Sequence, residues 1–233
     1  MRLLLFISIL ICYTNISAQD SIYITVKAGY KVKDVLTPTD IFQYSEFKAG
    51  KVFFKDGSKA AAKMNYSRLF DQILFIDTKD DTLAVADEKT IKFITIDRDT
   101  FYFDNGYMKL IADKGVIKLL EKEVWVVADI RKIGTFNRQT TTVAVNSFSS
   151  YTNGIDAAKS KDLILNEDIV LRKETQYYFG DEYNHFVRAG KKKLLLLFPK
   201  EELSIENYLK ENKVNFDKKE DLEKLAQFIG HLH

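Results

Sequence analysis

Short apolar runs, separated by turn residues, recur about every eight to twelve residues between Lys48 and Asp129, a spacing typical of β-rich domains. Asp56-Gly57 and Asn105-Gly106 fall between such runs, and pairs of this kind supply the positive φ that tight hairpin turns need. The pattern predicts one continuous β-meander whose apolar runs are 51–54, 73–76, 83–86, 91–96, 101–103, 107–111, 116–120 and 124–130.

Alternation inside these runs predicts which face of the sheet is buried. The apolar residues from Ala60 to Tyr66 recur at every second position, so that strand has one buried and one solvated face. Between Ile91 and Ile96 the apolar positions change face, which indicates either a β-bulge near 93–94 or a strand covered on both faces. The weaker alternation of Ile22, Ile24 and Val26 predicts an earlier strand within 20–35.

The period becomes helical near the C-terminus. Strands are predicted over 163–171, 176–179 and 183–188, followed by helices over 191–198 and 200–212. In a last helix, Asp217 is the predicted N-cap and Glu220 completes a capping box. A stripe at helical spacing follows, and Gly230 stands where a C-terminal glycine is expected; the stripe is Leu222, Leu225, Ala226 and Ile229.

These elements predict an α+β fold: an antiparallel β-meander of about ten strands followed by two or three short C-terminal helices packed on it. The predicted organisation is a signal peptide at 1–18, the β-meander at 19–134, a Thr/Ser-rich flexible loop at 135–160, and strands with helices at 161–233. Within 19–134, the segment 35–44 precedes the run of strands that begins at Lys48 and is predicted to be a connector with turn residues at its centre. Whether 135–160 is a functional flap or plain disorder stays open at this point.

The N-terminus has the pattern of a secretory signal peptide. Arg2 supplies the positive charge, 3–12 is an apolar run too short to span a bilayer, and Ser17-Ala18 supplies small residues for cleavage. Cys12 is the single cysteine, and it follows large apolar residues, which argues against a lipid anchor. Its loss with the leader would leave no disulfide, thiolate metal site or cysteine nucleophile.

Composition narrows the choice of partners. Apolar residues make up 46% of the chain, enough for a buried core. The 35 basic and 33 acidic residues nearly cancel, which argues against nucleic acid as a partner. No further apolar run is long enough for a transmembrane segment.

Four stretches carry a resemblance, and they cover most of the predicted mature chain: 50–66 (GKVFFKDGSKAAAKMNY), 81–87 (DTLAVAD), 101–110 (FYFDNGYMKL) and 195–225. In these stretches the chain resembles an uncharacterised family of secreted proteins from Bacteroidetes-type bacteria. The resemblance implies export and this fold, and it carries no catalytic residues.

Residues that could carry chemistry are few. His185 stands alone among aromatic residues, and His231 and His233 lie at the C-terminal end, so no zinc triad is indicated. Ser45 and Lys48 match Ser-x-x-Lys, but the companion motifs of such enzymes are absent.

The remaining motifs also have simpler explanations. No glycine-rich phosphate loop occurs. The Asp-rich segment 77–81 lacks the spacing and glycine of a calcium loop, and aspartate is common in turns. The basic run 191–193 precedes apolar residues, which is more typical of a buried helix with a charged start than of a membrane-surface helix. No catalytic, cofactor-binding or metal-binding residue is therefore assigned, and no cofactor is expected.

Three functional hypotheses remain. The preferred one is an exported, non-catalytic protein that binds another protein or a surface polymer in the periplasm or at the cell surface. The alternatives are a hydrolase that uses paired carboxylates, and a carrier of an apolar ligand inside a curved sheet. The identity of the partner, the pathway and the oligomeric state do not follow from the sequence.

We expect the protein from its native host to begin near Ala18 or Gln19, because cleavage follows the small residues after the apolar run. Intact-mass measurement tests this. Retention of 1–18, or an acyl group on Cys12, would contradict it.

Overall fold

The structure is a computed structural model that describes residues 22–133, 139–141, 146–152 and 163–232. The predicted leader and parts of 135–160 lie outside these residues. The strands are β1 (Tyr23–Val26), β2 (Lys48–Phe54), β3 (Lys59–Ser67), β4 (Gln72–Ile76), β5 (Thr82–Ala84), β6 (Ile91–Ile96), β7 (Asp99–Phe103), β8 (Tyr107–Asp113), β9 (Ile117–Ile133), β10 (Gln139–Thr141), β11 (Asn146–Ser147), β12 (Asp168–Asp181) and β13 (Phe186–Arg188).

Helices are short except at the C-terminus. The α-helices are α1 (Val32–Val35), α2 (Pro38–Ile41), α3 (Phe148–Tyr151), α4 (Lys191–Leu197), α5 (Glu202–Asn212) and α6 (Lys219–Gly230), and the 3-10 helices are η1 (Glu88–Thr90) and η3 (Pro199–Glu201). Among the described residues, no helix is long and apolar enough to cross a membrane.

All these strands belong to one antiparallel sheet, which confirms the predicted α+β meander. Its order is β1-β12-β9-β8-β7-β6-β2-β3-β4-β5, with β10 and β11 paired to β9 and β13 paired to β12. Strands β2 to β5 pair in sequence order, and so do β6 to β9. The two runs join where β2 pairs with β6, and β1 pairs with the distant β12. The sheet coils back on itself: the backbone N–H of Trp125 in β9 donates to the carbonyl oxygen of Arg68, just after β3.

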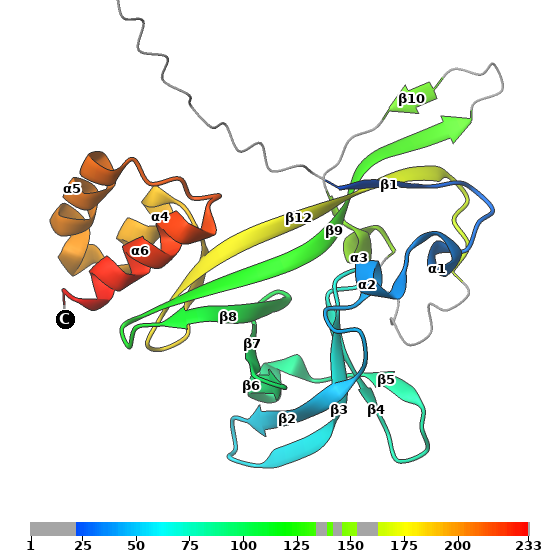
Figure 1. The fold of residues 1–233 in the computed structure, drawn as a ribbon, viewed down its shortest axis with the longest axis horizontal. Helices are drawn as coiled ribbons and strands as arrows, with labels where there is room; N and C mark the ends of the chain where they lie inside the picture. The colour runs from blue at the N-terminus through cyan, green and yellow to red at the C-terminus, as the bar shows by residue number, and fades with distance from the viewer. Residues whose placement is uncertain (1–21, 134–138, 142–145, 153–162, 233) are drawn as a thin grey trace, which may run out of the picture.

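Two long strands, β9 and β12, form the centre of the molecule (Figure 1). They pair along the whole of β12, from Asp168 opposite Arg131 to Asp181 opposite Ile117. The expectation of separate strands at 116–120 and 124–130, and at 163–171 and 176–179, was wrong. The polar residues between those runs lie inside continuous strands, because their backbone groups pair with the neighbouring strand like those of the apolar residues.

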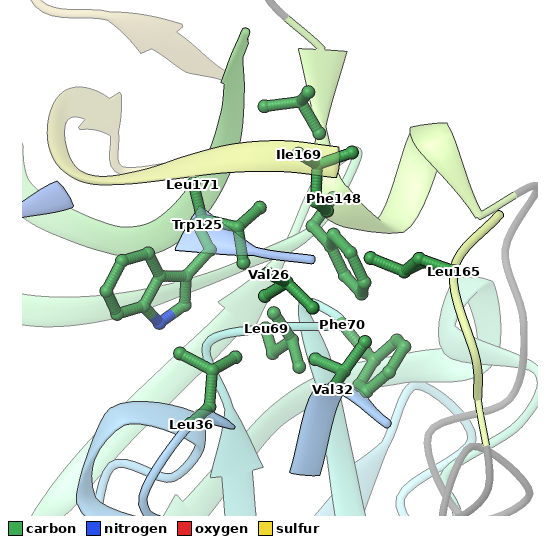
Figure 2. Packing of buried hydrophobic residues seen from close by; sticks show 11 residues of the cluster. Val26, Val32, Leu36, Leu69, Phe70, Trp125, Phe148, Leu165, Ile169 and Leu171 are labelled. Atoms are coloured by element: carbon green, nitrogen blue, oxygen red, sulfur yellow. The ribbon is translucent and has the colours of Figure 1, made fainter. Parts of the chain in front are cut away.

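At one end of this pair lies the N-terminal cluster of buried residues (Figure 2). Trp125 is fully buried there, and its indole nitrogen donates to the carbonyl oxygen of Asp40 over 2.9 Å. The rings of Phe70 and Phe148 meet edge to face with centroids 5.6 Å apart. The cluster consists of Val26, Val32, Leu36, Leu69, Phe70, Trp125, Val127, Phe148, Leu165, Ile169 and Leu171.

At the other end, helices α4 to α6 cover the sheet and form the helical cluster (Figure 1). The predicted stripe of α6 is fully buried there against β9 and β12. The predicted cap was wrong: Lys218 is the N-cap and provides no side-chain hydrogen bond. Instead, the Asp221 side chain accepts a hydrogen bond from the backbone N–H of Asn215, which holds the preceding turn.

A third group, the meander cluster, fills the inside of the coiled part of the sheet: Val52, Met64, Tyr66, Ile73, Ile91, Ile94, Ile96, Phe101 and Tyr107. The pairing of β2 with β6 shifts between Phe53 and Phe54, so Lys92 is an extra residue. This β-bulge turns Ile91 to the same side as Ile94 and Ile96. The bulge alternative was therefore right, and it lies just before the expected position.

Two other segments differ from a plain loop. The expected connector at 35–44 contains α2, in which Thr37 and Asp40 form a reciprocal capping box around Pro38. Within 135–160, the described residues form β10, β11 and α3, and Ser147 caps α3 by accepting from the Ser150 N–H.

We expect Leu225→Asp to lower the free energy of unfolding by about 4 kcal/mol or more, because it places an unpaired carboxylate in the helical cluster. Lys224→Asp is the control, since Lys224 is exposed on the same helix. Denaturant midpoints measure both effects, and equal shifts would contradict the assigned helix face.

Candidate functional site

Four aromatic rings from different strands form a continuous row, the outer aromatic row, made of Phe53, Phe93, Tyr102 and Phe186. The rings of Phe53 and Phe93 stack at 4.5 Å with planes 25° apart. Tyr102 lies 6.1 Å from Phe93, and Phe186 lies 5.5 Å from Tyr102. The row thus joins β2, β6, β7 and β13.

Strand alternation places this row on the face opposite the meander cluster. Phe53 and Phe93 are register partners, and their neighbours Val52 and Ile94 point into the cluster. All four rings of the row are half-buried. Because Phe53 and Phe93 stack on each other, each ring covers one face of the other.

Charged groups and a shallow hollow border the row. The Lys59 ammonium lies 5.2 Å from the centre of the Phe53 ring, a cation–π contact. A solvent-open hollow of about 560 Å³ lies along the same strands. It is lined by Ala49, Gly50, Lys51, Ala61, Ala62, Lys63, Thr95 and Asp97.

A second feature is a buried polar cluster between the coiled sheet and β9. Lys122 Nζ lies 2.5 Å from Asp71 Oδ2 and donates to the carbonyl oxygen of Asn105 over 3.2 Å. Asp71 Oδ1 accepts from the Tyr66 hydroxyl at 2.9 Å and from the Tyr107 backbone N–H at 3.0 Å. Burial raises the pKa of Asp71 above its ordinary value, although Lys122 acts in the opposite direction.

Local backbone geometry builds this cluster. Asp71 has a left-handed conformation with φ of 54°, at the turn between β3 and β4. Gly106 has φ of 120°, and a Cβ atom there would lie 1.9 Å from Lys122 Nζ and 2.1 Å from Asp71 Oδ2. The Asn105-Gly106 turn recognised in the sequence therefore also provides space for a buried ion pair.

A neighbouring group of charges lies on the opposite face of β9. Arg68 Nε lies 2.6 Å from Glu123 Oε2, and Lys173 Nζ lies 3.3 Å from Glu123 Oε1. Burial raises the pKa of Glu123, but Arg68 and Lys173 outweigh it and hold that pKa below its ordinary value. Glu121, next on that face, pairs with Lys109 at 2.8 Å and Lys219 at 3.7 Å.

Each of these buried or half-buried carboxylates faces a cation. Hydrolysis by paired carboxylates needs two carboxyl groups that face one substrate, one of them ready to donate a proton. Asp71, Glu121 and Glu123 instead form separate ion pairs. Their arrangement is that of groups that hold strands together.

The residues singled out in the sequence belong to neither feature, although His185 precedes Phe186 of the row in the chain. The side chain of His185 is 74% exposed, and its Nδ1 lies 2.7 Å from Asp181 Oδ2. Lys48 pairs with Glu46 at 2.6 Å. His231 follows α6, His233 lies outside the described residues, and Lys191 pairs with Glu206 at 2.7 Å.

The Asp-rich segment at 77–81 is a turn. Asp77 Oδ1 accepts from the backbone N–H groups of Lys79 and Asp81, a common role of aspartate in turns. In the described part of the chain, no group of three or more His, Cys, Asp or Glu side chains could hold a metal ion.

Comparisons with models of protein families, with curated proteins and with solved structures give no match to this chain. Its function is therefore inferred from its own surface and buried groups.

We expect Gly106→Ala to lower the free energy of unfolding by about 3 kcal/mol or more, because the new methyl group overlaps the buried ion pair and strains the backbone. Gly115→Ala is the matched control: its φ is also positive, at 79°, but a Cβ there meets no atom within 4 Å. We expect that control to lose about 1 kcal/mol. Equal losses of unfolding free energy in the two variants, measured by denaturant unfolding, would contradict the prediction. They would show that Lys122 and Asp71 move aside to make room for the methyl group.

Proposed function

We propose that this chain is an exported, non-catalytic protein of the cell envelope that binds another protein, or a surface polymer, through the outer aromatic row. The observation that carries the proposal is a row of four touching, half-buried rings on the face of the sheet turned away from the meander cluster. Apolar patches on a solvent-accessible face are commonly interaction sites.

The orientation of the rings favours a protein partner over a polysaccharide. Sugar rings stack on the faces of aromatic side chains, and in this row Phe53 and Phe93 each cover one face of the other. Ring edges suit contact with apolar side chains, and aromatic residues are enriched at the centres of protein interfaces. The neighbouring hollow offers space for a side chain of the partner.

The two alternatives have weaker support. A hydrolase would need free carboxylates, but Asp71, Glu121 and Glu123 each form an ion pair with a basic side chain. A carrier would hold its ligand inside the coiled sheet, and there the fully buried rings of Phe101 and Tyr107 occupy the interior. Export is supported by the predicted leader.

We expect the double variant Phe53→Thr with Phe93→Thr to lose retention of envelope components that the unaltered protein retains on a column. Threonine keeps the strand preference while removing both rings. Tyr183→Thr is the matched control, because Tyr183 is 73% exposed and lies outside the row. Thermal unfolding of each variant confirms that it is folded.

Equal retention by the double variant and the control would contradict binding through this row. Hydrolysis of an envelope polymer by the folded protein, lost in Glu123→Gln but not in the double variant, would instead support the hydrolase.

A further inference from the structure

The pair of Lys122 and Asp71 is more buried than the pairs that Lys109 and Lys27 form. The side chains of Lys122 and Asp71 are only 10% and 13% exposed, and their charged atoms lie 2.5 Å apart. Lys109 and Glu121 lie 2.8 Å apart, with the lysine side chain 23% exposed, and the side chain of Lys27 in its pair with Asp168 is 60% exposed. The amine and the carboxyl group of the first pair are thus held in contact and largely away from water.

A buried setting of low dielectric disfavours the charged form of a carboxyl group. In low dielectric, a proton moves from an ammonium to a neighbouring carboxylate more readily than in water. Burial is also the largest influence on Asp71, and it raises the pKa of this carboxyl group. A neutral amine beside a neutral carboxylic acid is the reactive pair for amide formation.

The two oxygens of Asp71 have different surroundings. Oδ1 accepts two hydrogen bonds, from the Tyr66 hydroxyl and the Tyr107 backbone N–H. Two such donors stabilise negative charge that develops on a carbonyl oxygen, as in an oxyanion hole. Oδ2 faces Lys122 Nζ instead. One oxygen is therefore placed to carry charge and the other to leave.

From this geometry we propose that Lys122 and Asp71 condense to an intramolecular amide bond that links β9 to the start of β4. The lone pair of the neutral Nζ attacks Cγ of the protonated carboxyl group, and negative charge develops on Oδ1. A proton passes from the nitrogen to Oδ2, the Cγ–Oδ2 bond breaks, and Oδ2 leaves as water. One C–N bond forms and one C–O bond breaks, so no oxidant, reductant or cofactor is required.

Three groups of the chain position the reactants. The carbonyl oxygen of Asn105 accepts from Nζ and fixes the direction of the amine. Gly106 packs over both reacting atoms and leaves no room for a side chain. The left-handed backbone at Asp71 turns the carboxyl group toward β9. This close positioning replaces a chance encounter of two groups with a held contact.

Peptide mapping tests the bond directly on the folded, full-length protein. Trypsin does not cleave after an acylated lysine, so an amide at Lys122 leaves peptide 119–131 uncut and joined to peptide 69–79. We expect this joined peptide, lighter than the sum of its parts by one water molecule. Separate peptides 69–79, 119–122 and 123–131 with no joined species would overturn the proposal.

Variants of the pair test the site. Lys122→Arg retains the positive charge but cannot form this amide, so the joined peptide should disappear. Asp71→Asn should give the same joined peptide, because loss of ammonia from asparagine leaves an identical product. Glu121→Gln is the control, since it alters another ion pair of β9, and the joined peptide should persist. Loss of the joined peptide in Glu121→Gln would contradict a bond that needs only the local arrangement around Lys122 and Asp71.

Should Lys122→Arg fail to fold, the map of the unaltered protein still decides the proposal. The bond is independent of the outer aromatic row, so Phe53→Thr with Phe93→Thr should leave the joined peptide unchanged.

Discussion

The pairing of β9 with β12 is the constraint on which the rest of this structure depends. Its ladder runs from Asp168 to Asp181 without a gap, apart from one irregularity near Val170. One end of the two strands carries Trp125 and Leu171 into the N-terminal cluster, and the other carries Leu119 and Phe179 into the helical cluster. Neither cluster could form if the register slipped by one residue, because every side chain would change face.

Between these two clusters the long strands carry charge instead of apolar side chains. Glu121, Lys122 and Glu123 follow one another in β9, and each meets an opposite charge from another part of the chain. Because a buried charge without its partner is costly, these pairs favour the single arrangement in which the coiled sheet meets β9. Lys122 reaches the coiled sheet through Asp71, while Glu123 reaches the segment after β3 through Arg68.

Sequence patterns could predict the strands and helix faces that follow from local periodicity. They could predict few of the contacts between residues that are far apart in the chain. The meander and the buried stripe around Leu225 follow from spacing alone. The polar run at 121–123 looked like an interruption, because its charge partners lie far away in sequence and the single sequence does not indicate them. Asp217 had the residue type of a cap but not the position, since the preceding turn is held by Asp221. The outer aromatic row was equally hidden, because its rings come from separate strands.

The pairing of β1 with β12 also has a consequence for the order in which the chain folds. Lys27 and Asp168, which join these strands, are 141 positions apart. A chain is synthesised from its N-terminus, so β1 emerges long before its partner strand exists. All residues of the meander cluster lie between Val52 and Tyr107, and they can assemble while later residues are still being added. The meander cluster can therefore form before β12 exists, whereas β1 can take its place in the sheet only after β12 has been made.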